Sequence, residues 1–205
     1  IHRPPADAPL DELATGKHIT QQRLALEELL AHSLSVQQMK KKRAAEIAPH
    51  LKADPALIKR FLTALPFQLT QAQKRVIKEI NHDMQGVIPM QRLLQGDVGS
   101  GKTVVAAFAT LIAIANHYQV ALMAPTELLS EQHYQHFHRW LTPLGFHVVC
   151  LNAGLKGKVK KQILDEIKIG KAHIAIGTHA LFQDGVHFEN LGFIIVDEQH
   201  RFGVQ

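Results

Sequence analysis

The chain has 205 residues, with 23 Lys and Arg against 18 Asp and Glu and a net charge of +5. Hydrophobic residues make up 46% of it and charged residues 20%, which excludes a wholly disordered chain. The single cysteine, Cys150, excludes an internal disulfide framework. The longest apolar run, Val104–Ala115, is shorter than the roughly 18 residues of a membrane span, so no membrane partner is expected. Because the first residue is Ile1 and not Met, we expect a piece of a longer protein.

The front of the chain predicts a connector followed by a long helix. Three prolines within residues 2–14 favour an extended segment. From about Gln21 to Glu46, leucines at four-residue spacing predict a helix with one apolar stripe, formed by Leu26, Leu30 and Leu34. The basic run Lys40–Arg43 near its end is either a solvated face or a nucleic-acid contact, and the sequence leaves both open.

A second, shorter helix should begin at Asp54-Pro55, an N-cap followed by a first-turn proline. We expect it and the long helix to pack on a neighbour, since a helical pair this small buries little surface by itself. Pro66 ends the segment. The predicted organisation is therefore residues 1–65 as connector and linker helices and residues 66–205 as one domain.

Beyond residue 66, short apolar runs alternate with helical stretches. The runs are Arg92–Gln95, Val120–Ala124, Val148–Leu151, His173–Gly177 and Phe193–Asp197. The helical stretches are Lys102–Asn116, Glu127–Leu141 and Lys156–Ile169. This alternation predicts an α/β fold, with a parallel sheet covered on both faces.

A phosphate-binding loop stands between the first run and the first helix. The pattern G-x-x-x-x-G-K-[ST] is matched at every fixed position by Gly96-Asp97-Val98-Gly99-Ser100-Gly101-Lys102-Thr103. The glycines let successive backbone N–H groups point inward around an anion, and the helix N-terminus adds positive charge. Lys102 would reach the β- and γ-phosphates, and the Thr103 hydroxyl would bind Mg²⁺.

Two acids, Asp197 and Glu198, follow the last apolar run. A buried parallel strand carries its C-terminal end to the ligand-binding edge of the sheet. There Asp197 would bind Mg²⁺, and Glu198 would orient and deprotonate the attacking water. These two motifs together predict a P-loop nucleoside triphosphatase.

The acids also carry a resemblance. Asp197-Glu198-Gln199-His200 resembles the D-E-x-H box of superfamily 2 helicases. Further matches resemble the bacterial RecG family of branched-DNA helicases: Leu65–Gln73, the phosphate loop, Ala124–Leu129, Gly177–Leu181 and Arg201–Gln205. The resemblance covers most of the chain from about residue 66 and extends more weakly through the front helices.

This resemblance implies a RecA-like motor domain, truncated at its C-terminus, of an enzyme that uses ATP and Mg²⁺. It implies translocation on duplex DNA and remodelling of replication forks and Holliday junctions in recombination and repair, in the bacterial cytoplasm. A wedge domain and a second motor domain with an arginine finger would be missing, so we expect the chain alone to bind nucleotide weakly at best and not to translocate.

The resemblance also assigns residues. Gln73 would belong to the adenine-recognising Q motif, although Thr70–Gln73 also reads as a capping box for the next helix, and both roles stay open. Thr126 and Thr178 would touch the DNA backbone, which suits sequence-independent tracking. Thr126 is equally a plausible N-cap. Gln199 and His200 would couple the nucleotide site to DNA and to the second motor domain.

Three rival functions remain at this point. The transcription-repair coupling translocase shares the motor motifs but differs at Gln199-His200. The others are a non-catalytic nucleic-acid-binding module with a vestigial loop and a P-loop ATPase that moves something other than DNA.

Other polar and aromatic residues carry less weight. His133, His136 and His138 are interpreted as a solvated helix surface, Trp140 as a core residue and Cys150 as a buried inert thiol.

Overall fold

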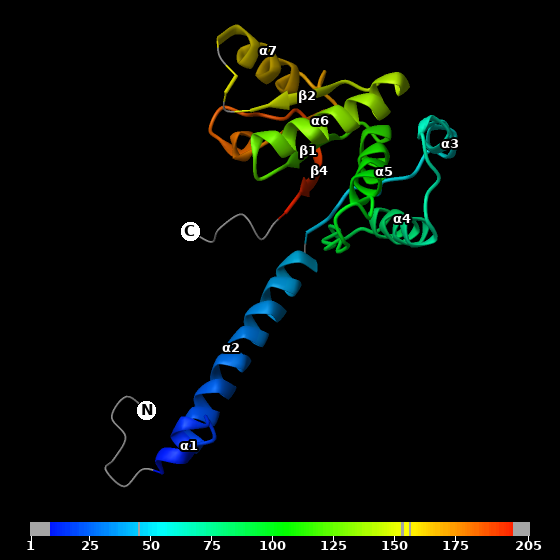
Figure 1. Cartoon of the computed structure of the whole chain (residues 1–205). Helices are drawn as coiled ribbons and strands as arrows, with labels where there is room; N and C mark the ends of the chain where they lie inside the picture. Colours follow the sequence, from blue (N-terminus) through cyan, green and yellow to red (C-terminus); the bar gives the residue numbers. More distant parts are fainter. Residues whose placement is uncertain (1–8, 45, 153, 156, 199–205) are drawn as a thin grey trace. The chain divides into compact units, whose positions relative to one another are not determined.

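The computed structural model describes residues 9–44, 46–152, 154–155 and 157–198 (Figure 1). The chain divides into two compact units, Ile1–Ala48 and Pro49–Gln205. The described residues of the first unit form two helices, and those of the second form the sheet with the helices packed against it.

The first unit consists of α1, Leu10–Ala14, and α2, Ile19–Ala44. The predicted long helix is confirmed, but its apolar residues are spread around the helix rather than gathered in one stripe. Three of its leucines are each more than half exposed: Leu26, Leu30 and Leu34. The described residues of the first unit therefore do not cover the apolar side chains of this helix. No described helix combines the length and apolar character that crossing a bilayer requires.

The second unit is built on a four-stranded parallel sheet in the order β2-β3-β1-β4. The strands are β1, Gln119–Met123; β2, Val148–Leu151; β3, Ile174–Gly177; and β4, Leu191–Val196. Their apolar residues suit strands that are covered on both faces. The predicted α/β fold with a parallel sheet is confirmed.

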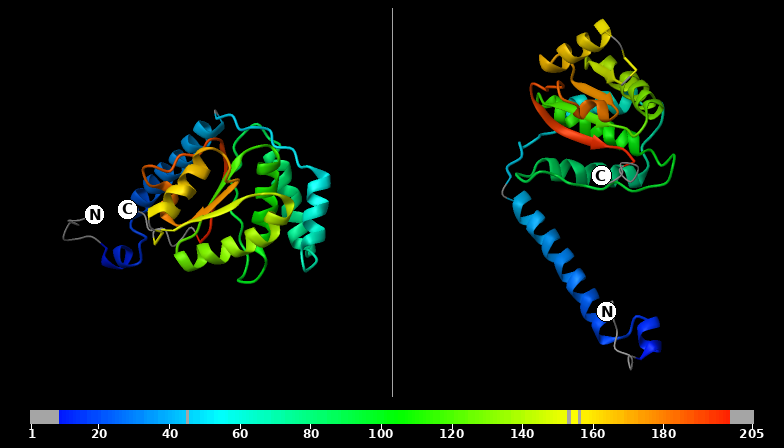
Figure 2. Two further views of the ribbon diagram at one scale, coloured as in Figure 1. Left: turned by 90° about the horizontal axis from the view of Figure 1, so that it is seen from above. Right: turned by 90° about the vertical axis from the view of Figure 1, so that its left-hand side faces the viewer.

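Helices cover both faces of this sheet. On one face lie α5, Lys102–Ala115, and α6, Glu127–Leu141, which share a core with Ile174 and Ile176 of β3. On the other face, α7, Gly157–Lys168, packs on a smaller core that contains Ala175. The alternation along β3 follows from the period of two of a strand. Figure 2 shows α5 and α7 on opposite sides of the strands.

Two helices that precede the phosphate loop also belong to this unit. They are α3, Pro55–Ala64, and α4, Gln71–Met84. Phe61 of α3 is 0% exposed and meets Trp140 of α6 edge to face, with ring centroids 6.5 Å apart. The unit therefore begins at Pro49, whereas the sequence placed the division after Leu65. Trp140 is a core residue, as predicted.

Two short 3₁₀ turns complete the unit, η1 at Thr142–Leu144 and η2 at His179–Phe182.

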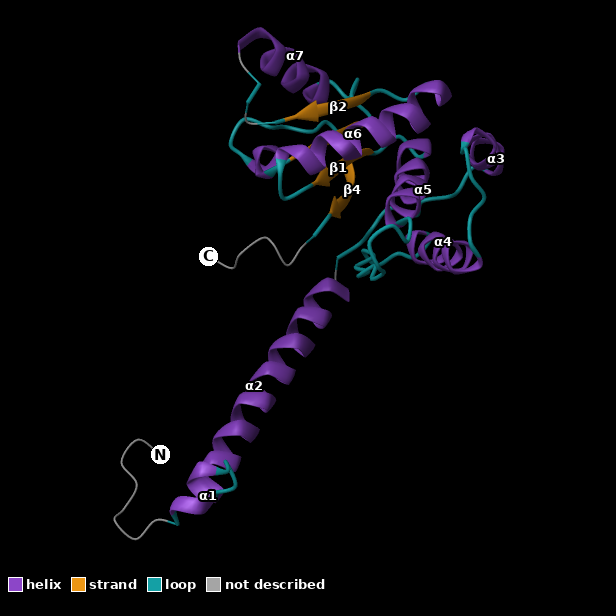
Figure 3. Cartoon of the chain, in the orientation of Figure 1, coloured by secondary structure: helices purple, strands orange, loops and turns teal. Residues whose placement is uncertain are grey.

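One predicted strand does not form. Residues Arg92–Gln95 run as irregular backbone into the phosphate loop (Figure 3). A strand exists only where its backbone groups pair with a neighbour, and none of the four described strands pairs with this segment. Among the described residues β4 is an edge strand, which pairs with β1 on one side and with no strand on the other. Arg92 is held instead by ion pairs to Glu79 and Asp83 of α4, at 2.6 and 2.7 Å.

Phe61→Ala tests whether α3 belongs to the sheet unit. Removing a fully buried ring costs about 3–5 kcal/mol, so we expect a clear fall of the thermal unfolding midpoint. Leu62→Ala, on the exposed side of the same helix, is the matched control and should change the midpoint far less. Equal unfolding midpoints for the two variants would show that α3 does not belong to the sheet unit.

Candidate nucleotide-binding site

The carboxyl ends of three strands meet at one edge of the sheet. The N–H of Ala124, after β1, donates to the carbonyl of Gly177 at 2.9 Å, and the N–H of Asp197, after β4, donates to the carbonyl of Met123 at 2.8 Å. These bonds continue the strand pairing beyond the last strand residues. Asp197 is thereby fixed at the same edge as the segments that follow β1 and β3, as the sequence predicted.

Two of the three glycines of the phosphate loop are required by the backbone conformation. Gly99 and Gly101 have positive φ angles of 82° and 81°, a conformation that other residues rarely adopt. A Cβ at Gly101 would also clash with the side-chain amide of Gln73, and one at Gly96 would lie 2.8 Å from the Ser100 hydroxyl. Gly101 is the N-cap of α5, so the loop ends where the helix begins. The positive φ angles and the close neighbouring side chains both confirm the predicted glycine-rich turn.

The side chain of Lys102 folds back over this loop. Its Nζ donates to the carbonyls of Gly96 and Asp97, at 2.6 and 3.0 Å. The first N–H groups of α5 have no partner within the helix, and their dipoles add positive charge at the same place. The loop, the ammonium and the helix N-terminus together form a site for an anion such as phosphate.

Gln73 connects this loop to helix α4. Its Oε1 accepts from the N–H of Thr70 at 2.8 Å, and its own N–H donates to the Thr70 hydroxyl at 3.2 Å, which confirms the capping box. Its Nε2 donates to the carbonyl of Ser100 at 2.9 Å. Gln73 therefore caps α4 and supports the phosphate loop with the same side chain.

Asp197 has a partner that the sequence did not reveal. Nε2 of His133, on α6, lies 2.7 Å from Oδ2 of Asp197, and the His133 side chain is only 14% exposed. The interpretation of His133 as a solvated surface residue is therefore wrong, because α6 turns this face toward the end of β4. His136 and His138 are exposed, as predicted.

The charge state of Asp197 follows from these neighbours. Its pKa is lowered, first by the hydrogen bond with His133, while burial opposes the shift. The backbone N–H of Glu198 and the positive charge of Lys102 lower this pKa further. Helix α5 packs on β1 and β4 and leads into β1 after three residues, so its N-terminal end, with the phosphate loop, lies at the carboxyl edge where Asp197 stands.

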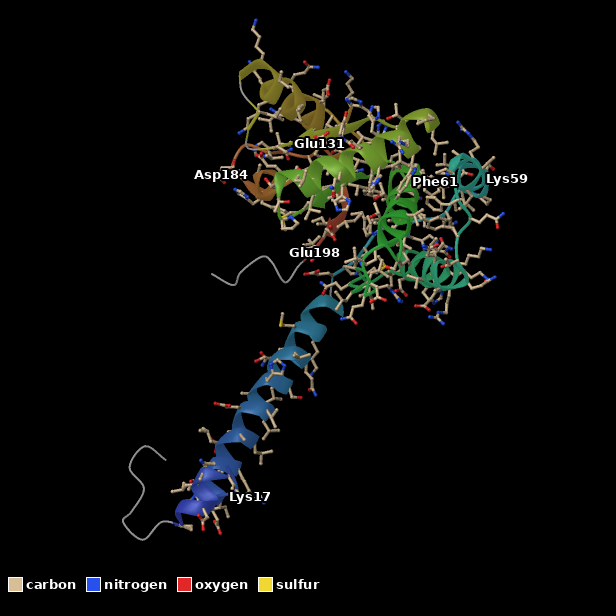
Figure 4. The ribbon with its side chains drawn as sticks, in the orientation of Figure 1. Lys17, Lys59, Phe61, Glu131, Asp184 and Glu198 are labelled. Carbon is tan, nitrogen blue, oxygen red and sulfur yellow. The ribbon has the colours of Figure 1, made fainter. Side chains whose placement is uncertain are left out.

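Glu198 follows directly and has a left-handed backbone, with φ of 51°. Figure 4 labels it at the end of β4. The predicted coupling residues, Gln199 and His200, lie outside the described residues, as do the RecG-like residues that follow them.

The two threonines expected at DNA differ in exposure. Thr126 is exposed and caps α6, because its hydroxyl accepts from the N–H of Leu129 at 3.2 Å. Thr178 is only 4% exposed, and its hydroxyl has no hydrogen-bond partner among the described residues. Thr126 therefore presents its side chain to solvent at this edge and Thr178 does not.

The donors at this edge suit Mg²⁺ carried with a nucleotide. The Thr103 hydroxyl and the ionised Asp197 carboxylate offer the oxygen ligands that Mg²⁺ prefers, and phosphate oxygens would supply others. The described residues contain no cluster of three or more His, Cys, Asp or Glu that could hold a metal by themselves. Elsewhere, Cys150 is half-buried and not fully buried as predicted, and its burial raises the pKa of the thiol to about 11, which suits an inert thiol.

Comparison with known proteins agrees with this geometry. The DEAD/DEAH box helicase family model matches residues 70–205. The chain belongs to the DEAD/DEAH box helicase family.

Two similar proteins are named ATP-dependent DNA helicase RecG. The one from Haemophilus influenzae is 52% identical over 206 residues, and the one from Escherichia coli K12 is 51% identical over 204. Each match covers 100% of this chain, which spans 29% of the relative's length. The resemblance to RecG that the motifs carried is confirmed.

A solved structure described as RecG bound to a three-way DNA junction is 43% identical, with a TM-score of 0.81. It covers 90% of this chain, and this chain covers 25% of it. This match and the family model confirm the RecA-like fold of the domain.

Gln73→Ala and Thr70→Ala together separate the two roles of Gln73. Each variant breaks the capping box, so we expect each to lose about 1 kcal/mol of stability. Only Gln73→Ala also removes support from the phosphate loop, so only this variant should weaken binding of a non-hydrolysable ATP analogue, measured by isothermal titration. Equal affinities of the two variants would leave Gln73 with the capping role alone.

Proposed function

We propose that this chain is the nucleotide-binding part of an ATP-dependent DNA helicase that remodels branched DNA in recombination and repair. The observation that carries the proposal is the placement of the phosphate loop, with Lys102, and of Asp197 at the same carboxyl edge of the sheet. The relatives named RecG support DNA as the polymer, and branched DNA in particular. They also favour this function over a transcription-repair coupling translocase.

ATP would bind with its phosphates in the loop Gly96–Thr103. Lys102 would exchange the two carbonyls it now contacts for oxygens of the β- and γ-phosphates. Such an exchange needs no new element, because Nζ already lies within the loop. Gln73, fixed between Thr70 and Ser100, stands at the loop's border, where it would also contact adenine.

Thr103 and Asp197 would hold Mg²⁺. When bound, the ion neutralises phosphate charge that develops as the γ-phosphoryl group leaves. Asp197 is suited to this role because its lowered pKa keeps the carboxylate ionised. A carboxylate offers about four acceptor sites, so beside the bonds from His133 and from the N–H of Glu198 it can still bind the metal or its water.

Glu198 would act as the general base. It follows the proposed metal ligand directly, and its left-handed backbone sets its direction relative to Asp197. Its carboxylate would orient the attacking water and accept a proton from it as the water oxygen bonds to the γ-phosphorus.

Thr126 is the best placed residue for a DNA backbone contact. Its hydroxyl oxygen accepts from Leu129, which leaves the hydroxyl hydrogen to donate to a phosphate oxygen. The N-terminus of α6 also favours an anion. Thr178 has weaker support, since its hydroxyl is buried, and a contact there would need a rearrangement.

The longer protein would supply the other parts. By resemblance these are a wedge domain for branch points and a second motor domain with an arginine finger, and the setting would be the bacterial cytoplasm. An arginine finger contributes about 10³–10⁵ in rate in other P-loop enzymes. We therefore expect weak nucleotide binding and no translocation from these 205 residues alone.

Lys102→Ala tests nucleotide binding. The variant removes the one side-chain cation of the loop, so we expect Mg²⁺-dependent binding of an ATP analogue to weaken at least about tenfold. Lys168→Ala, an exposed lysine on α7, is the matched control and should bind as the unchanged chain does. Binding that is indifferent to Lys102→Ala would favour a vestigial site and a non-catalytic module.

Glu198→Gln tests the general base in the longer enzyme. Because glutamine cannot accept the proton, DNA-stimulated hydrolysis should fall by about 10²–10⁴, while the affinity for ATP is kept. Steady-state hydrolysis and analogue binding measure the two separately. Unchanged turnover would remove Glu198 as the base.

A further inference from the structure

We propose that His133 is a positioning residue, which fixes the Asp197 carboxylate to helix α6 and so couples the metal ligand to the DNA-facing end of that helix. The inference rests on the proposed function, because it takes Asp197 as a metal ligand and Thr126 as a DNA contact. It concerns a residue that no sequence motif marks and that is not itself expected to touch nucleotide or metal.

The contact is short and largely shielded from water. Nε2 of His133 and Oδ2 of Asp197 are 2.7 Å apart, with side-chain exposures of 14% and 28%. An ionised carboxylate can only accept, so Nε2 must carry the hydrogen. Nδ1 is buried and has no hydrogen-bond partner among the described residues. The ring therefore directs its one satisfied polar contact at Asp197.

Such a bond restricts how the carboxylate turns about its last torsion. With Oδ2 held by His133, the second oxygen keeps one direction, which a metal ion or its bound water can use. Without His133, only the bond from the Glu198 N–H restrains the carboxylate, which therefore loses order. Partners that orient a metal ligand in this way typically affect metal affinity or activity about 10–100-fold when they are removed.

The first turn of the same helix is tied to a different part of the sheet edge. The Ser130 hydroxyl lies 2.7 Å from Oδ1 of Asn152, and Oε1 of Glu127 accepts from the N–H of Gly154 at 3.1 Å. Both partners belong to the segment that follows β2. Thr126 caps the helix at this end. The N-terminus of α6 is therefore anchored where the DNA backbone is proposed to run.

Seven positions separate Thr126 from His133, about 10 Å along a continuous helix. A helix packed on a sheet moves as one body more readily than it bends, because its backbone hydrogen bonds and buried face resist deformation. A shift of its N-terminus on a phosphate would therefore move the His133 ring relative to β4. The geometry points to α6 as the element through which bound DNA adjusts the metal ligand.

The test uses the longer, helicase-active protein with three variants. His133→Leu keeps a similar volume and removes the hydrogen bond, and His133→Gln keeps an N–H donor at similar reach. His138→Leu is the matched control, since His138 is an exposed histidine of the same helix. Circular dichroism and thermal midpoints establish that each variant is folded.

Two readouts distinguish positioning from packing. In His133→Leu, we expect the Mg²⁺-dependent gain in affinity for an ATP analogue to fall, by isothermal titration, and the Mg²⁺ concentration for half-maximal hydrolysis to rise about tenfold. At saturating Mg²⁺, the kcat for DNA-stimulated hydrolysis should fall about 10–100-fold, with the KM for ATP changed less than threefold. His133→Gln should recover most of both losses, and His138→Leu should show neither.

Three results would overturn the inference. If His133→Leu keeps its Mg²⁺ dependence and kcat within twofold, His133 does not position Asp197. If His133→Gln is as defective as His133→Leu, the ring serves packing. If Mg²⁺ dependence shifts but the ratio of DNA-stimulated to basal hydrolysis does not, coupling through α6 is wrong.

Two further outcomes are a variant that does not fold and a longer protein that is inactive without any substitution. Should His133→Leu not fold, His133→Asn replaces it, because the shorter amide cannot reach Asp197; the same outcomes then apply. If the unchanged longer protein neither binds nor hydrolyses ATP, it is the proposed function that fails, and this result is distinct from an unchanged variant of an active enzyme.

Discussion

The parallel pairing of β4 with β1 is the constraint on which the site depends. It places Asp197 at the carboxyl edge of the sheet and holds it there by the bond from its N–H to the carbonyl of Met123. An antiparallel β4 would carry the two acids to the far edge, away from Lys102. Two segments 95 positions apart (197 − 102) act on one another only because this strand runs in the same direction as its neighbours.

Charge and hydrogen bonding at this edge are already arranged before any ligand enters. Lys102 and the N-terminus of α5 make one side positive, and the ionised Asp197 carboxylate makes the other negative. A triphosphate with its magnesium ion is complementary to this arrangement. Its phosphate oxygens suit the positive side, and the magnesium ion suits the negative side. His133 joins this arrangement to α6, so that a helix presenting Thr126 to solvent also contacts the proposed metal ligand.

Local sequence patterns predicted much of the fold and of the site. They did not predict features that depend on contacts between segments distant in the sequence. The phosphate loop before Lys102 needs positive φ angles, and the glycines in its sequence predict them directly. A strand at Arg92–Gln95 was expected from its apolar residues, but pairing needs a neighbour that no local pattern reports. The roles of Phe61 and His133 likewise come from helices packed across the unit, which spacing within one helix cannot show.

The most direct test of the central claim is an amide NMR titration of this chain with a magnesium–ATP analogue. The account predicts that the amide signals of Gly99, Gly101 and Asp197 shift together and saturate with one dissociation constant. Signals at the opposite edge of the sheet, such as Gln119 and Gly145, should stay in place. Shifts confined to that opposite edge, or a loop that responds while Asp197 does not, would contradict a shared nucleotide site.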